Sequence, residues 1–195
     1  KNSTKLIFDE ISIGWRLCLG GAHMIYGVNP DMAVFAKTIS NGFPMGAIIG
    51  TASTMEAAQK SFISSAYWTE GVGPAASVAC IEKMKKNDIP SHLNTIGKYF
   101  QLKWKEIGKR YDLPVFSKGR PELVQIGFNH PEANSLMTLF TTRMLDEGFL
   151  ATSGFNPTWA HQKRHVDDYF DKAESVFAEL LESIEKKDIN QKINN

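Results

Sequence analysis

Residues 5–9 (KLIFD) and 32–37 (MAVFAK) carry the strongest structural signal in this sequence. Each is a short apolar, β-prone run that ends in a charged side chain, Asp9 in the first and Lys37 in the second. Such runs are typical of buried strands in a parallel sheet. A third apolar run, at residues 47–50, follows a loop that contains two glycines and a proline. We therefore expect three parallel strands of an α/β sheet before residue 60.

Helical patterns follow these strands. Residues 73–86 have Pro74 near their start and lysines at their end, which is typical of the first and last turns of a helix. Residues 91–111 repeat apolar side chains at helical spacing. After these helices, the patterns predict a strand at 123–128, a helix at 133–147, a short strand at 149–151, a helix at 166–187 and a polar, frayed tail.

The organisation of the chain suggests two domains. After Asp112-Leu113-Pro114, the long helical patterns give way to alternating strand and helix patterns, so we place a domain boundary near residue 110. Residues 1–110 are then an α/β unit that ends in a long helix, and residues 111–195 are an α+β unit.

Three strands are few for a doubly wound sheet, because sheets typically contain five or six strands. The chain therefore has the pattern expected of the back half of a larger protein.

Composition excludes several classes of protein. The 195 residues are 43% hydrophobic and 22% charged, which argues against disorder or a coiled-coil rod. The chain has 22 basic and 21 acidic side chains, which gives a net charge of +1. This balance does not indicate the positively charged surface that proteins use to bind nucleic acid or an anionic membrane. The apolar runs are too short to span a bilayer. The two cysteines, 62 residues apart without a CxxC motif, favour a reducing cytoplasm.

Three features of the α/β region point to chemistry. Ligands of open α/β sheets bind beyond the carboxyl ends of the strands, where we expect Asp9 and Lys37 to face one crevice. A lysine can form a Schiff base with a carbonyl, and a carboxylate can hold a cationic ring nitrogen. Thr69 precedes a predicted helix, whose N-terminus can hold a phosphate. Pyridoxal 5'-phosphate needs all three partners, for its aldehyde, pyridinium and phosphate.

Four motifs, in order and at family spacing, carry a resemblance that strongly covers residues 5–86. They are LIFDEISIGWR (6–16), YGVNPD (26–31), AVFAKTISNGFPMGAIIG (33–50) and SSAYWTEGVGPAASVACIEKM (64–84). Together they resemble class III pyridoxal-phosphate-dependent aminotransferases, in the glutamate-1-semialdehyde aminomutase-like branch. The rest of the chain matches only as the family's C-terminal small domain. The resemblance implies fold-type I, with a partial large-domain sheet, an interdomain helix and an α+β small domain.

The resemblance also implies a role for each site residue. Lys37 would form the internal aldimine and shuttle a proton between the substrate Cα and the cofactor. Asp9 would pair with the pyridine nitrogen, and Ile11 takes the position of a valine that packs on the ring. Thr69 would bind the cofactor phosphate, usually that of the neighbouring subunit, which implies a homodimer with shared active sites. The family's N-terminal half, with its phosphate-binding loop and ring-stacking aromatic residue, is absent from this sequence.

The implied function is amino-group transfer by an aminotransferase or a 2,1-aminomutase, from a small-molecule amino donor to a carbonyl acceptor. Two alternatives remain open. A cofactor-free Schiff-base lyase would use Lys37 but would leave Asp9 and Thr69 without a role. A truncated, non-catalytic structural half would bind the cofactor weakly and would show little or no turnover. The substrate is open in every case.

Each site residue also has an ordinary structural interpretation. Asp9 can be an ion-paired acid, Lys37 a solvated lysine and Thr69 a helix cap. Ile11 can be a core residue, while Arg16 can either meet a substrate carboxylate or form a surface salt bridge. The five histidines lack metal-ligand spacing, so we assign no metal site.

Overall fold

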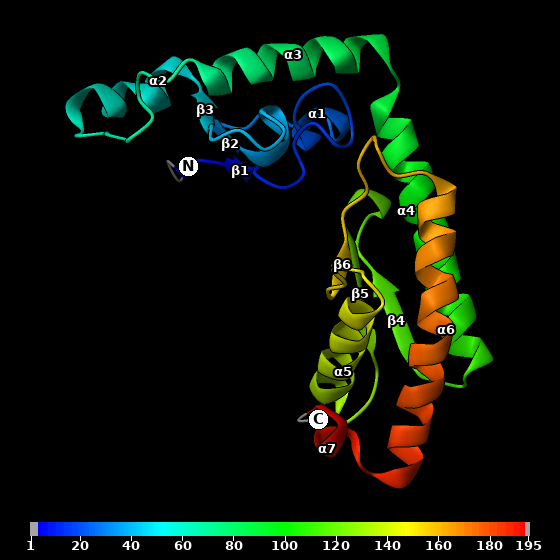
Figure 1. Ribbon diagram of the computed structural model, residues 1–195. Coiled ribbons are helices and arrows are strands. Elements are labelled where there is room, and N and C mark those ends of the chain that lie inside the picture. Colours follow the sequence, from blue (N-terminus) through cyan, green and yellow to red (C-terminus); the bar gives the residue numbers. More distant parts are fainter. Residues whose placement is uncertain (1–3, 194–195) are drawn as a thin grey trace. The chain divides into compact units, whose positions relative to one another are not determined.

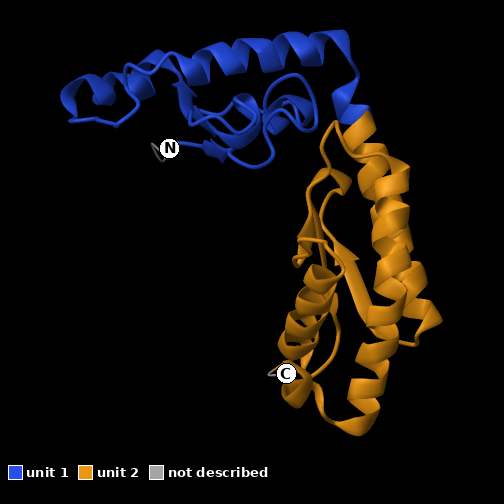
Figure 2. Cartoon of the chain, in the orientation of Figure 1, with its two compact units in different colours: residues 1–91 blue, residues 92–195 orange. Residues whose placement is uncertain are grey.

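The computed structural model describes residues 4–193 (Figure 1), and the chain divides into two compact units at Ser91 and His92 (Figure 2). This division lies before the boundary predicted near residue 110, inside the first turn of helix α4 (Ile89–Arg110). The reason is that α4 packs its apolar side chains, among them Phe100 and Trp104, into the core of the second unit. In terms of packing, the helix therefore belongs mainly to the second unit.

The sheet of the first unit contains β1 (Ile7–Asp9), β2 (Met32–Phe35) and β3 (Ala47–Gly50), in that order. β1 and β2 are parallel, but β3 is antiparallel to β2, so the prediction of three parallel strands was wrong for the third. A parallel connection needs a crossover of a dozen or more residues, usually a helix. The β2–β3 connection contains only one 3-10 turn, η1 (Lys37–Ile39), and the chain reverses direction there.

Between residue 4 and the start of α4, the first unit also contains short and medium-length helical segments. They are α1 (Ala22–Ile25), η1, α2 (Ala52–Met55), η2 (Glu56–Lys60) and α3 (Val72–Lys86). The start of α3 lies against the β2–β3 connection at Gly73. A Cβ atom at Gly73 would lie 2.7 Å from the Pro44 carbonyl oxygen, so only glycine permits this close approach.

The second unit is an antiparallel sheet with helices. Its strands, in sheet order, are β4 (Val115–Lys118), β5 (Val124–Phe128) and β6 (Gly154–Phe155). Its other elements are α4, η3 (Pro121–Leu123), α5 (Ala133–Asp146), α6 (Lys163–Lys186) and α7 (Ile189–Ile193). The strand predicted at 149–151 was wrong, because β6 instead pairs Gly154 and Phe155 with β5. β4 was not predicted, because only two of its four residues are strongly apolar.

Aromatic side chains form the centre of the second unit. Trp104 is fully buried, and its ring lies edge-on to Phe140 and Phe177, with ring centroids 5.4 and 5.3 Å away. Its indole Nε1–H donates a hydrogen bond to the Phe116 carbonyl oxygen at 3.0 Å. A buried indole is satisfied in this way, and edge-to-face aromatic pairs add to its burial.

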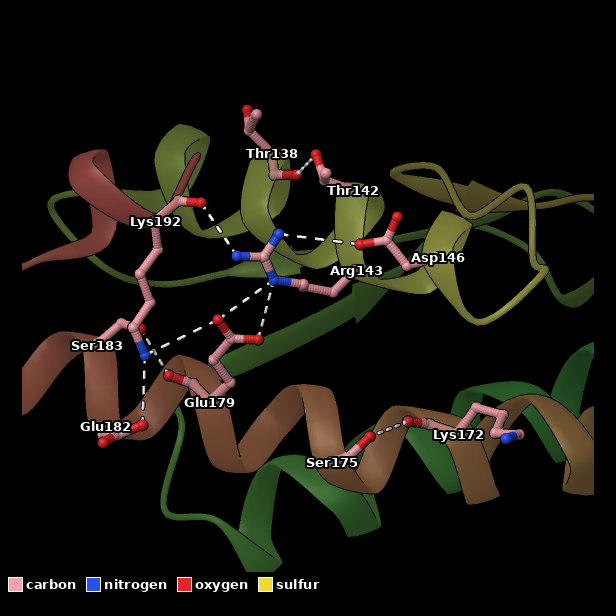
Figure 3. Close-up of polar contacts among 10 residues, drawn as sticks. All are labelled: Thr138, Thr142, Arg143, Asp146, Lys172, Ser175, Glu179, Glu182, Ser183 and Lys192. Carbon is pink, nitrogen blue, oxygen red and sulfur yellow. Dashed lines mark hydrogen bonds and ion pairs between the residues drawn. The ribbon is translucent and has the colours of Figure 1, made fainter. Parts of the chain in front are cut away.

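The C-terminal tail is more ordered than predicted. Residues 189–193 form α7, and Ile189 is 1% exposed within the core of the second unit. Arg143 contacts this segment (Figure 3): its Nη2 donates to the Lys192 carbonyl oxygen at 3.0 Å, while its Nε contacts both carboxylate oxygens of Glu179. The prediction of a frayed tail was wrong for these residues, and residues 194–195 lie outside the described part of the chain.

The longest helices are amphipathic rather than uniformly apolar. α6, for example, alternates buried positions such as Val176 and Leu180 with exposed charged side chains such as Lys172 and Glu182. Between residues 4 and 193, no helix has the length and apolar character needed to cross a membrane.

Candidate active site

The two strands that precede the predicted site residues run side by side in the same direction. Asp9 is the last residue of β1 and lies opposite Val34, while Lys37 follows the end of β2 by two residues. The Glu10 N–H donates to the Val34 carbonyl oxygen at 2.9 Å, which continues the pairing past Asp9. Because parallel strands end at the same sheet edge, Asp9 and Lys37 lie at one edge.

Asp9 presents a carboxylate with one uncommitted oxygen. Its side chain is exposed, and Oδ1 accepts a hydrogen bond from the Ile11 N–H at 3.0 Å. Within residues 4–193, the structure records no hydrogen-bond partner for Oδ2. The contact at Oδ1 orients the carboxylate, and Oδ2 is available to a cationic group.

Lys37 has an unusual backbone conformation. Its φ angle is +51°, in the left-handed region that residues other than glycine rarely adopt. Residues held in this region concentrate at functional sites. The Asn41 N–H donates to its carbonyl oxygen at 2.9 Å, which stabilises this turn. Its Nζ donates a hydrogen bond to the Ser12 hydroxyl at 2.5 Å. The amine therefore lies beside the loop that follows Asp9.

Two cavities open beside the β2–β3 connection, and Pro44 and Met45 line both. The first, of about 490 Å³, is also lined by Lys37 and Arg16. The second, of about 680 Å³, is also lined by Ile11 and by aromatic residues of the segment before α3. Those aromatic residues are Tyr67 and Trp68. Lys37 and Ile11 thus face neighbouring cavities, and Asp9 and Thr69 line neither of them.

Thr69 does not cap α3. It lies exposed in a turn at residues 66–69, whereas the N-cap position of α3 is Gly71, where no side chain accepts a capping hydrogen bond. The capping interpretation of Thr69 was therefore wrong. The structure places its hydroxyl on the surface just before a 15-residue helix, and its phosphate-binding role stays a prediction.

A buried acid, Glu10, was not among the predicted site residues. Its side chain is 0% exposed, and its carboxylate accepts hydrogen bonds from the backbone N–H groups of Ala22 and His23 at 2.9 and 3.0 Å. The His23 Nδ1 lies 3.0 Å from the same carboxylate. Glu10 thus closes the loop between β1 and α1. Its partners are 12 and 13 residues away, and no local pattern in the sequence indicates that pairing.

Glu10→Gln should lower the free energy of unfolding by about 1–3 kcal/mol, the penalty for leaving buried hydrogen-bonding groups unsatisfied. The reason is that an amide NH2 group replaces one acceptor oxygen beside N–H donors. Urea unfolding followed by circular dichroism measures the change, and Glu70→Gln is the exposed control in the same unit. Equal stability of the two variants would show that the loop does not depend on this carboxylate.

The loop after Asp9 is held tightly around Glu10 and Ser12. The Gly14 N–H donates to the Glu10 carbonyl oxygen at 2.9 Å, and a Cβ at Gly14 would lie 2.7 Å from that oxygen. Arg16 donates from Nε to the Ser12 carbonyl oxygen at 2.8 Å, and burial lowers the pKa of its guanidinium. Arg16 is therefore a half-buried residue of this loop.

Comparison with known sequences gives consistent matches. A family model described as aminotransferase class-III matches residues 1–177. A 3-aminobutyryl-CoA aminotransferase from Cloacimonas acidaminovorans (strain Evry) is 32% identical over 144 residues, 72% of this chain and 35% of that protein. A glutamate-1-semialdehyde 2,1-aminomutase from Methylacidiphilum infernorum (isolate V4) is 31% identical over 184 residues, 85% of this chain and 42% of that protein. The chain thus spans less than half the length of these relatives.

Solved structures share the fold. "Structure of PLP internal aldimine form of Sphingopyxis sp. MTA144 FumI protein" matches with a TM-score of 0.84 at 19% identity, over 93% of this chain and 44% of that one. "Crystal structure of an omega-transaminase from Sphaerobacter thermophilus" matches with a TM-score of 0.76 at 20% identity, over 90% of this chain and 44% of that one. These likenesses confirm the predicted fold class, that of fold-type I transferases, with a partial sheet followed by an α+β unit.

Proposed function

Because the chain belongs to the class-III aminotransferase family, we propose that it supplies the lysine and the acid of a pyridoxal 5'-phosphate site for amino-group transfer. The observation that carries this proposal is the position of Asp9 and Lys37 at one edge of two parallel strands. An amine and a carboxylate placed in this way match the aldehyde and the ring nitrogen of the cofactor. When bound, the cofactor supplies an electron sink that acidifies the Cα–H bond of an amino substrate.

Each residue then has a defined task. Lys37 would hold the cofactor through Nζ, and its amine would move the proton at the substrate Cα. Asp9 offers its uncommitted Oδ2 to the ring N–H, and its negative charge favours the protonated ring. Ile11, which lines the larger cavity, packs on the ring face. The positions of Asp9 and Lys37 at the ends of the two parallel strands support the first two assignments.

Thr69 has its task in an assembly of two chains. We propose that its exposed hydroxyl binds the cofactor phosphate of a neighbouring subunit in a homodimer. Exposure supports this role, because Thr69 lies in a turn before α3 where another chain can reach it. The protein is proposed to act in the cytoplasm on a small amino donor and a carbonyl acceptor, as an aminotransferase or a 2,1-aminomutase.

Turnover is proposed to need a polypeptide equivalent to the N-terminal half of the relatives. From residue 4 onward, the first unit has a sheet of three strands, and the apolar side chains of Ile7, Ile48 and Ile49 on its outer strands are exposed. In folded proteins, other strands, helices or loops normally cover apolar sheet faces and unpaired sheet edges of this kind. In this proposal, residues 1–110 complete the large domain and end in the interdomain helix α4, whose apolar side chains pack into the core of the small domain formed with residues 111–195. Alone, the chain would bind the cofactor weakly.

The test is a single half-reaction. We expect the purified chain, given excess pyridoxal phosphate and L-glutamate, to form pyridoxamine phosphate slowly, as measured by chromatography. Asp9→Asn should lower this rate by roughly 100-fold, because a neutral amide cannot stabilise the protonated ring. Glu56→Gln, which changes an exposed acid at the start of η2 in the same unit, should leave the rate unchanged.

Two results would contradict the proposal. A rate in Asp9→Asn equal to that of the unchanged chain would remove Asp9 from the site. Failure of the unchanged chain to form pyridoxamine phosphate at any cofactor concentration would favour the non-catalytic structural half.

A further inference from the structure

Ser12 lies three residues after Asp9, in the loop between β1 and α1. Its side chain is half-buried, and its hydroxyl accepts the 2.5 Å hydrogen bond from the Lys37 Nζ. In the described part of the chain, this is the one polar contact recorded for the Lys37 amine. The contact joins two segments that are 25 residues apart in the sequence.

The backbone around Ser12 is well anchored. The Glu10 N–H bonds to β2 through the Val34 carbonyl oxygen, and the Arg16 N–H bonds to the Ile13 carbonyl oxygen at 3.1 Å. The Arg16 side chain adds the 2.8 Å bond from Nε to the Ser12 carbonyl oxygen. The Ser12 hydroxyl is therefore carried on a loop that is bonded on both sides.

Lys37 needs such an anchor, because its side chain is long and exposed. A lysine has four rotatable side-chain bonds and samples many rotamers unless a contact selects one. The left-handed backbone of Lys37 sets where the side chain starts, but only a contact at Nζ sets where it ends. The Ser12 hydroxyl supplies that contact at the sheet edge where β1 ends with Asp9.

We propose that Ser12 is a positioning residue that holds the Lys37 amine at the cofactor site. The inference rests on the proposed function and extends it by one residue. It predicts that the position of the Lys37 amine depends on the hydroxyl group at residue 12 and not on the size of that side chain. Ser12→Thr keeps the hydroxyl, whereas Ser12→Val has the same shape as threonine and lacks it.

The experiment measures the selectivity of lysine labelling rather than enzyme activity. The complete 195-residue chain is incubated with pyridoxal phosphate and reduced with borohydride, and peptide mass spectrometry compares labelling at Lys37 and at Lys60, an exposed lysine of the same unit. The unchanged chain and Ser12→Thr should label Lys37 preferentially. Ser12→Val should lower the ratio of Lys37 to Lys60 labelling by roughly fivefold, the factor that corresponds to one ordinary hydrogen bond.

The outcomes separate the two proposals. Equal ratios in Ser12→Thr and Ser12→Val would overturn the role of Ser12, while preferential labelling of Lys37 in both would keep the proposed site. Lack of preference for Lys37 in the unchanged chain would overturn the proposed site and this inference together. Circular dichroism of Ser12→Ala, the smallest change at this position, should match that of the unchanged chain. A Ser12→Ala chain that is folded and fully selective would also overturn the inference.

Discussion

Lys37→Ala should abolish the attachment of borohydride-trapped pyridoxal phosphate at position 37 while the chain remains folded. In the proposed function the Lys37 amine is the reacting group, so its removal leaves no nucleophile at that position. Folding should survive, because the Lys37 side chain is exposed and its recorded polar contact is with Ser12. The φ angle of +51° suits alanine no worse than lysine, since both carry a Cβ. Peptide mass spectrometry after reduction gives the measurement, with circular dichroism as the folding check.

Lys60→Ala is the matched control, since Lys60 is an exposed lysine of the same unit, at the end of η2. It should leave trapping at Lys37 unchanged. Preferential trapping at another lysine in the unchanged chain would refute the assignment of Lys37 and return it to the role of a solvated lysine.

Trp104→Ala should lower the free energy of unfolding of the second unit by about 3–5 kcal/mol, the usual cost of removing a large buried aromatic side chain. Trp104 is 0% exposed and packs against Phe140 and Phe177, so the substitution leaves a cavity at the centre of the core. It also leaves the Phe116 carbonyl oxygen without its indole donor. Urea unfolding followed by far-ultraviolet circular dichroism measures the loss.

Leu102 provides the control on the same helix. It is 52% exposed, so Leu102→Ala should change the free energy of unfolding by no more than about 0.5 kcal/mol. Similar losses in the two variants would mean that Trp104 is not the centre of the core. In that case α4 would not be an integral part of the second unit.

The parts of the fold that depend on local pattern could be predicted from the sequence. Apolar runs at residues 5–9 and 32–36 became β1 and β2, and amphipathic spacing after residue 90 became α4. The chain order of an acid after one strand and a lysine after the next placed Asp9 and Lys37 at one sheet edge. Hydrophobic periodicity and secondary-structure propensity depend on residues that are close in sequence. These features can therefore be predicted without a structure.

Other features of the site could not be predicted, because they depend on contacts between distant segments. The direction of β3 follows from how the chain turns after Lys37, and its apolar pattern fits either direction. The burial of Glu10 depends on N–H groups at Ala22 and His23. An apolar run such as β3 and an acid such as Glu10 occur in many folds, so the sequence alone indicated neither the strand direction nor the burial of the acid.

The order of residues therefore established the fold class, the family and the two residues at the carboxyl ends of the parallel strands. Three-dimensional packing established that Glu10 lies buried, that the Lys37 amine meets Ser12, and that residues 189–193 form a helix rather than a frayed tail. The physical reason is the range of the interactions. Secondary structure follows from neighbours along the chain, whereas a hydrogen bond between residues 25 positions apart exists only once the sheet has formed.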